Sequence, residues 1–138
     1  MWDTRHGPWR ARLNQLNRGG AGAWSTRYNN VAQWLHIDLG EVSKVVAVAT
    51  QGRYDANQWV KKYKISYSVY GRLLLERLIA IVMNCLFFQM FPGNSDRNTV
   101  VYNRLYPSFK SRFVRIYPKQ WHGHISMRVE LYGCNSGR

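Results

Sequence analysis

The chain has 138 residues, with 20 lysines and arginines against 7 aspartates and glutamates, which gives a formal charge of +13. This length fits one domain, and an apolar fraction of 46% is enough to form a core and excludes a disordered chain. Four prolines without a glycine period exclude collagen, and two cysteines exclude a disulfide-dense mini-protein. Seven acidic residues also disfavour an enzyme built on paired carboxylates.

The basic excess favours acidic partners, which include anionic lipid headgroups, sulfated glycans and nucleic acid. A solvated basic surface without a ligand is the alternative, and charge alone does not choose between them. The lysines and arginines are scattered along the chain and form no cluster on a helix. We therefore expect no binding to nucleic acid.

Apolar residues recur with a period of two, which is typical of half-buried strands. Leu35, Ile37 and Leu39 alternate with polar or aromatic neighbours and predict a strand over 33–39, and the more continuous apolar run at 42–50 predicts a strand covered on both faces. Further strands are predicted over 62–69, 99–105, 112–117 and 126–132. Turn-rich stretches at 17–22, 26–30, 52–58, 92–98 and 120–123 separate them, so the pattern predicts a sandwich or a barrel.

One segment departs from this pattern. Residues 72–91 read RLLLERLIAIVMNCLFFQMF, with apolar side chains on every face of a helix and no strand-like alternation. The apolar part is too short and too interrupted to predict a membrane span. A buried core helix is the alternative structural interpretation.

Four stretches, taken in their order and spacing, carry a family resemblance. They are WRARLN at 9–14, GAW…QWLHIDLG at 22–40, ATQGRYDANQWVKKYKISYS at 49–68 and FPGNSD…SRFVRIYPKQWHGHISMRVELYGC at 91–134. The chain resembles the discoidin domain, also called the coagulation factor 5/8 type C domain, as it occurs in secreted and cell-surface adhesion proteins. The resemblance covers nearly everything except 72–90. It implies an all-β fold, an eight-stranded antiparallel jelly-roll sandwich of the galactose-binding-like kind.

The chain departs from the family pattern in two places. Cys134 matches the family's final cysteine, but the chain starts too late to contain the upstream cysteine that would form a disulfide with it, and no secretory signal precedes the domain. We therefore expect a discoidin-type domain over 1–134 that is truncated at its N-terminus and lacks its first strand, followed by a tail over 135–138. Segment 72–90 replaces an aromatic, polar strand–turn–strand, and an incorrect exon boundary or a translated intron explains it better than a genuine variant does. Cys85 lies in that segment and is not expected to pair with Cys134.

The resemblance implies three ligand-binding loops at one end of the sandwich, at 2–9, 25–32 and 53–59. Tryptophan and tyrosine have one apolar and one polar end, which suits a membrane interface or a sugar face, and a neighbouring arginine can bind phosphate, sulfate or carboxylate. Several loop contacts must act together to give useful affinity. The residues expected to bind the ligand are Trp2, His6, Arg27, Tyr28, Arg53, Tyr54 and Asn57.

Other aromatic and basic residues are expected to be structural. Large aromatics are mostly buried, so Trp24 and Trp34 are assigned to the core. By the family resemblance, the arginines in or next to strands should pair with the few acids, here Asp38 and Glu130; these arginines are Arg12, Arg112, Arg115 and Arg128.

A metal site has weak support in the sequence. His122 and His124 could place two imidazoles on one strand face, but no third ligand is apparent, so we expect no metal. The chain also contains no GxSxG, HExxH or P-loop motif. We expect neither a cofactor nor enzymatic activity.

Taken with the resemblance, these features predict an extracellular binding or cell-adhesion module within a larger secreted or membrane protein. Its expected partners are cell-surface anionic phospholipid, glycan or extracellular protein, with peripheral membrane contact. Two alternatives are an accessory module that holds an enzyme on carbohydrate, and a non-functional gene fragment. The sequence leaves the ligand and the oligomeric state open.

Overall fold

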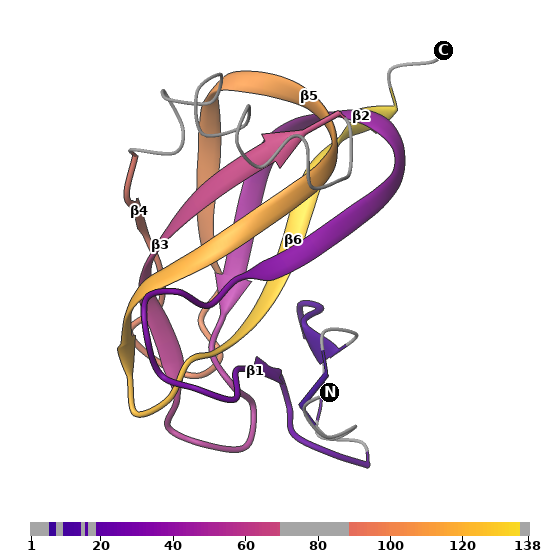
Figure 1. Ribbon diagram of the computed structural model, residues 1–138. Coiled ribbons are helices and arrows are strands. Elements are labelled where there is room, and N and C mark those ends of the chain that lie inside the picture. The colour runs from indigo at the N-terminus through magenta and orange to yellow at the C-terminus, as the bar shows by residue number, and fades with distance from the viewer. Residues whose placement is uncertain (1–5, 8–9, 15, 17–18, 70–88, 136–138) are drawn as a thin grey trace.

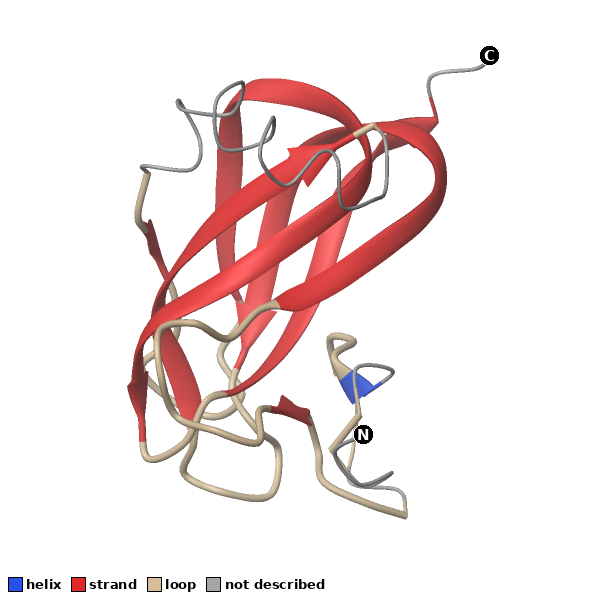
Figure 2. Ribbon diagram, in the orientation of Figure 1, coloured by secondary structure: helices blue, strands red, loops and turns tan. Residues whose placement is uncertain are grey.

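The computed structural model describes residues 6–7, 10–14, 16, 19–69 and 89–135 (Figure 1). They form one antiparallel sheet of six strands in the order β1-β6-β2-β5-β3-β4. The strands are β1 (Trp24–Ser25), β2 (Leu35–Gln51), β3 (Trp59–Ser68), β4 (Phe91–Pro92), β5 (Val101–His122) and β6 (Ser126–Asn135). Strands account for almost all of the regular structure in Figure 2, which confirms the predicted all-β class.

The two longest strands, β2 and β5, each contribute to both layers of the sandwich. The first part of β2, at 35–38, pairs with 113–116 of β5, whereas its last part, at 47–50, pairs with 101–104 of β5 and with β6. The register shifts between Val45 and Ala47, where both strands bend. One layer thus contains β3, β4 and one half each of β2 and β5, and the other contains β1, β6 and the remaining halves.

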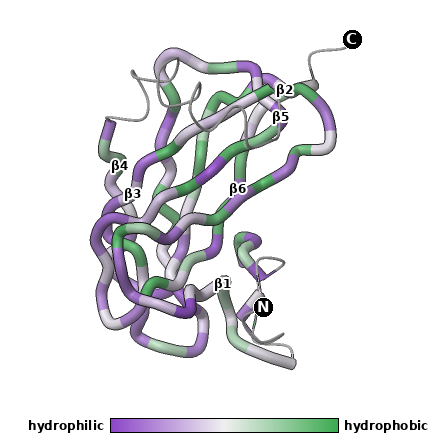
Figure 3. Tube along the Cα trace, in the orientation of Figure 1, coloured by the Kyte–Doolittle hydropathy of each residue, from purple (hydrophilic) through white to green (hydrophobic). Residues whose placement is uncertain are grey.

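The predicted strands at 33–39 and 42–50 are therefore one continuous strand, as are those at 99–105 and 112–117. Counting each bent strand as two segments turns the six strands into eight, which is the number expected for the jelly roll. Hydrophobic and hydrophilic residues alternate along much of these strands (Figure 3), so that each layer has one face directed inward.

The core lies between the two layers. Ile65, Val114 and Ile116 of the first layer and Val48 of the second are all 0% exposed, and burial of side chains of this size stabilises the fold by about 1.5–3 kcal/mol each. Tyr63 is also 0% exposed; burial raises the pKa of its phenol, which remains neutral and accepts a hydrogen bond from Asn103 at 3.0 Å.

Of the two tryptophans assigned to the core, one is buried and the other is exposed. Trp24 is 7% exposed and belongs to the core, as predicted, but Trp34 is 49% exposed, and its assignment to the core is wrong. The neighbouring Leu35 and Ile37 face inward, and side chains alternate along an extended chain, so Trp34 points to the outer face. There the guanidinium of Arg115 lies over its indole, 5.2 Å from the ring centroid.

The structure describes the contacts of two arginines that were expected to pair with acids. Arg112 binds Asp38 through two hydrogen bonds of 2.9 and 3.2 Å, which holds the pKa of that carboxyl below its usual value, but the pair lies at the surface and is not buried. Arg128 is the buried arginine, at 1% exposure, and it donates to neutral oxygens of the 52 and 97–98 turns.

The sequence analysis also singled out the two cysteines and the atypical apolar segment. Cys134, which matches the family's final cysteine, is an exposed free thiol near the end of β6. Residues 70–88, which hold most of the atypical apolar segment and Cys85, lie outside the described residues. In the part of the chain that is described, no helix is long and apolar enough to cross a membrane.

Candidate functional site

Loops from three distant parts of the chain meet at one end of the sandwich. The loop at 26–34 joins β1 to β2, the loop at 52–58 joins β2 to β3, and the turn at 123–125 joins β5 to β6. Figure 1 shows these connections together at the end where β1 lies. Two of them overlap loops that the family resemblance implied. The third shares only Gly123 with the turn predicted at 120–123, because residues 120–122 belong to β5.

The turn at 123–125 holds the 26–34 loop in place. His124 donates from Nε2 to the carbonyl of Thr26 at 2.7 Å and accepts from the Asn29 amide at Nδ1, at 2.9 Å, which a neutral imidazole satisfies on both sides. The side-chain oxygen Oδ1 of Asn29 accepts from the backbone N–H of Ile125, and the backbone N–H of Thr26 donates to the Ile125 carbonyl. These four bonds fix both the start and the middle of the loop against the turn that leads into β6.

Arg27 and Tyr28 occupy the exposed part of this loop. Tyr28 is 57% exposed, and the Arg27 guanidinium carbon lies 5.4 Å from the centroid of its ring. This cation–π contact restrains both side chains without neutralising the charge. An exposed ring with a cation over it offers an apolar surface and an anion-binding group to the same ligand.

The 52–58 loop is closed by its own side chains. The Arg53 guanidinium donates to Asp55 at 2.6 Å and to the Gln58 side-chain oxygen at 3.0 Å. Burial alone would raise the pKa of Asp55, but the hydrogen bonds from Arg53 and from the backbone N–H of Gly22, together with the charge of Arg53, outweigh it and lower that pKa. Arg53 was expected to be exposed; it is half-buried instead, and Asp55 neutralises much of its charge.

Gly22 joins the chain before β1 to this loop. Its N–H donates to Asp55 at 3.2 Å and its carbonyl accepts from the Tyr54 N–H at 3.2 Å. A Cβ at position 22 would lie 2.5 Å from the Cβ of Tyr54, so only glycine allows this approach. Tyr54, which is 38% exposed, is thereby held beside the segment that leads into Arg27 and Tyr28.

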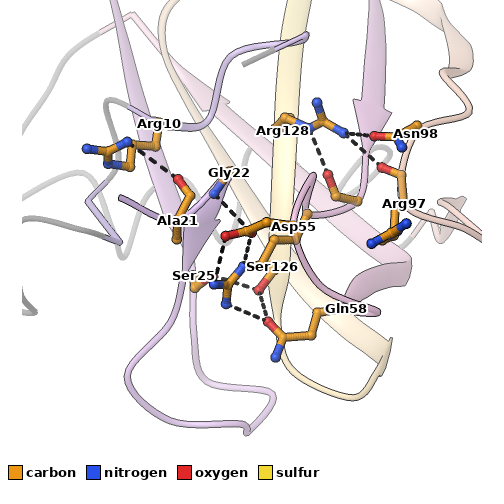
Figure 4. A network of polar contacts seen from close by, with 12 residues as sticks. Arg10, Ala21, Gly22, Ser25, Asp55, Gln58, Arg97, Asn98, Ser126 and Arg128 are labelled. Atoms are coloured by element: carbon orange, nitrogen blue, oxygen red, sulfur yellow. Dashed lines mark hydrogen bonds and ion pairs between the residues drawn. The ribbon is translucent and has the colours of Figure 1, made fainter. Parts of the chain in front are cut away.

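A chain of buried hydroxyls and amides connects the three segments (Figure 4). Ser25 of β1 and Ser126 of β6 share a hydrogen bond of 2.7 Å, and Ser126 donates to Gln58 at 3.0 Å. Gln58 also accepts from Arg53, so the network extends from the start of one loop to the other. The loops therefore rest on a common polar base, which limits their relative movement.

Arg128 anchors the far side of this base, as Figure 4 also shows. Its Nε donates to the Gly52 carbonyl at 2.8 Å, and its terminal nitrogen donates to the Arg97 carbonyl at 2.9 Å and to the Asn98 side chain at 2.8 Å. Burial lowers the pKa of Arg128, and Tyr54 opposes that effect electrostatically. This residue thus positions the start of the 52–58 loop.

The remaining expected site residues are placed as follows. His6 is half-buried, and its carbonyl accepts from the N–H of Ser25 at 3.2 Å, so this residue lies beside β1 at the same end of the molecule. Asn57 is exposed, and its carbonyl lies close to Gly123. Trp2 lies outside the described residues.

The two histidines that suggested a metal have other contacts. His122 stacks on Trp59 with centroids 4.3 Å apart and ring planes 13° from parallel, and His124 supports the 26–34 loop. No group of three potential metal-ligating side chains occurs within the described ranges. His124 thus has a structural role in supporting the 26–34 loop, and the sequence analysis did not predict that role.

Comparison with known proteins places this architecture in a family. The family model described as the F5/8 type C domain matches residues 2–131. Mouse retinoschisin is 38% identical over 136 residues, which cover 93% of this chain and 56% of the relative, so the chain spans little more than half of that protein.

Solved structures agree with the family match. Discoidin II of Dictyostelium discoideum superposes with a TM-score of 0.80 at 29% identity, over 96% of this chain and 52% of that one. A family 32 carbohydrate-binding module from C. perfringens NanJ, solved with galactose, shares the fold with a TM-score of 0.63 at 17% identity, over 92% of this chain and 82% of that one. The chain belongs to the F5/8 type C, or discoidin, domain family.

Proposed function

We propose that this chain is an extracellular binding module, without enzymatic activity of its own, that attaches to an anionic cell-surface ligand through the loops at 26–34 and 52–58. The observation that carries the proposal is the Arg27–Tyr28 pair, an exposed ring with a guanidinium over it, on a loop that four hydrogen bonds hold to the turn at 123–125. A rigid sandwich that presents such a loop loses little conformational entropy on binding.

Phosphate, sulfate and carboxylate are the groups that fit this pair, and they occur on both lipids and glycans. The formal charge of +13 raises the local concentration of any anionic ligand. A fold relative solved with galactose supports a glycan as the carrier of the anionic group, and the amphipathic tyrosines support a lipid headgroup equally. An enzyme's accessory module would use the same loops, and only neighbouring domains would separate that role from adhesion.

The test measures binding of the chain to phosphatidylserine vesicles, to phosphatidylcholine vesicles and to an array of neutral and acidic glycans. We expect retention on anionic vesicles or on acidic glycans that weakens as salt is raised. Tyr28→Ala should lower the affinity about tenfold, because an exposed aromatic anchor of this kind contributes about 1–2 kcal/mol.

Tyr106→Ala is the matched control. Tyr106 is 70% exposed and has the Arg104 guanidinium 5.3 Å from its ring centroid, but it lies in the bend of β5, away from the strand ends that carry the loops. Equal loss of binding in both variants would contradict a loop site. Salt-independent binding to neutral sugars alone would contradict an anionic ligand.

A further inference from the structure

The outer face of the first layer carries a strip of alternating rings and cations that is separate from the loop tips. The strip consists of Trp34 from the end of the 26–34 loop, His36 from the start of β2, Arg115, Tyr117 and Lys119 from β5, and Lys64 from β3. Register places His36 opposite Arg115 and Tyr117 opposite Lys64, and residues directly opposite in an antiparallel pair share a face. We propose that this strip binds a linear sulfated glycan.

Each cation of the strip on β5 is held by a neighbouring ring. The Arg115 guanidinium lies 5.2 Å from the Trp34 centroid and donates to His36 at 3.1 Å, while the Lys119 ammonium lies 5.7 Å from the Tyr117 centroid and donates to the Val31 carbonyl at 2.9 Å. Arg115 and Lys119 are four residues apart, so their positions on the strand are separated by about 13 Å. A short run of a chain molecule can span both.

The strip is also a place of concentrated positive charge. Partial burial and the nearby ammonium of Lys64 both lower the pKa of Lys119, which shows that these two cations repel each other. Asp38, two residues beyond His36 on β2, is bound to Arg112, which offsets its negative charge. An incoming polyanion would relieve the repulsion, so charge complementarity favours it.

The arrangement of the rings favours sulfate over nucleic acid. Bases bind by stacking on open aromatic faces. Here cations already lie against the rings of Trp34 and Tyr117, and His36 stacks on Phe113 with centroids 5.5 Å apart. Sulfates bind the cationic groups and not the rings, and Trp34, which is 49% exposed, offers further apolar surface to a sugar.

The test uses the full chain, a heparin-derived octasaccharide and the same octasaccharide after desulfation. Arg115→Gln with Lys119→Gln should weaken binding to the sulfated octasaccharide at least about tenfold and lower the slope of log affinity against log salt by about two. Arg104→Gln with Lys110→Gln removes the same charge from two exposed positions outside the strip and should change affinity less than about twofold. Thermal melting of both variants checks that each is folded.

Three results would overturn the proposal. One is an equal loss in the strip and control variants, which would mean diffuse charge attraction. The second is equal binding of the desulfated octasaccharide, and the third is tighter binding to a single-stranded 20-mer DNA. Vesicle binding by Tyr28→Ala reports on the loop site, and octasaccharide binding by the strip variant reports on the strip, so failure of one remains distinguishable from failure of the other.

Discussion

Arg128 should be the side chain whose loss most weakens the base under the loops. It is 1% exposed, and its guanidinium donates to the carbonyls of Gly52 and Arg97 and to the side-chain oxygen of Asn98. The variant Arg128→Met keeps most of the side-chain volume and removes these donors. The expected outcome is therefore a loss of hydrogen bonding with little loss of packing.

The magnitude follows from the exposure of the three acceptors. The Gly52 residue is buried, so its carbonyl would be left unpaired at a cost of about 1.5–3 kcal/mol. Arg97 and Asn98 are exposed, and water can replace their lost bonds for about 0.5–1 kcal/mol each. Burial disfavours the charged guanidinium, and removing it returns part of that cost, which leaves a net destabilisation of about 2–3 kcal/mol.

Thermal unfolding measures this loss, with Arg104→Met as a control that removes the same charge from an exposed position. For a domain of this length, about 3 kcal/mol corresponds to a fall of roughly 10 °C in Tm. The control should change Tm by less than about 2 °C. If the two variants melt together, the hydrogen bonds of Arg128 do not stabilise the loop end as reasoned.

Two further predictions concern the loop at 52–58. Gly22→Ala would push a Cβ against Tyr54, and we expect weaker vesicle or glycan binding with a lower Tm; an unchanged affinity would show that the position of Tyr54 does not matter. The second concerns Asp55, whose folded pKa lies below the ordinary value of 3.8, so its contact with Arg53 stabilises the protein fully above that value and is lost as the pH falls through the lower folded pKa. The difference in stability between the natural chain and Asp55→Asn should therefore shrink as acid titrates this group, and a difference that stays constant as the pH falls ever further below 3.8 would contradict the assignment.

The fold class could be predicted because strand periodicity and the family motifs agree over most of the chain. The two bends could not. Around Gly40, with φ of +83°, the Asp38 carboxylate accepts the Gly40 N–H, a local turn signal that suggests a break between two strands. Pairing with β5 resumes at Ser43, so β2 continues through that turn.

The alternation that predicts the strand at 33–39 also indicates the direction in which Trp34 points. Alternation with Leu35 and Ile37 puts Trp34 on the outer face, but the general tendency of large aromatics to be buried was given more weight. The local alternation is the better guide at this position than the usual burial of tryptophan. Assigning Trp34 to the core also removes from the surface one of the rings on which the sulfated-glycan proposal rests.

The loops of the candidate site were located by resemblance, whereas their contacts depend on tertiary structure. Ser25 and Ser126 are 101 residues apart in sequence yet share a hydrogen bond. The sequence also did not distinguish Arg27, which lies over a tyrosine, from Arg53, which an acid in its own loop neutralises. Such differences follow from which side chains the fold brings within reach.

Amide chemical-shift mapping tests most directly whether the loop end is the binding surface. The labelled chain is titrated with nanodiscs of phosphatidylserine and, in a second arm, with a carboxylate-bearing glycan without sulfate that it retains on the array. The account predicts shifts that concentrate in 26–34, 52–58 and 123–125. Shifts centred on the bend of β5 near Tyr106, with those three segments unchanged, would contradict it.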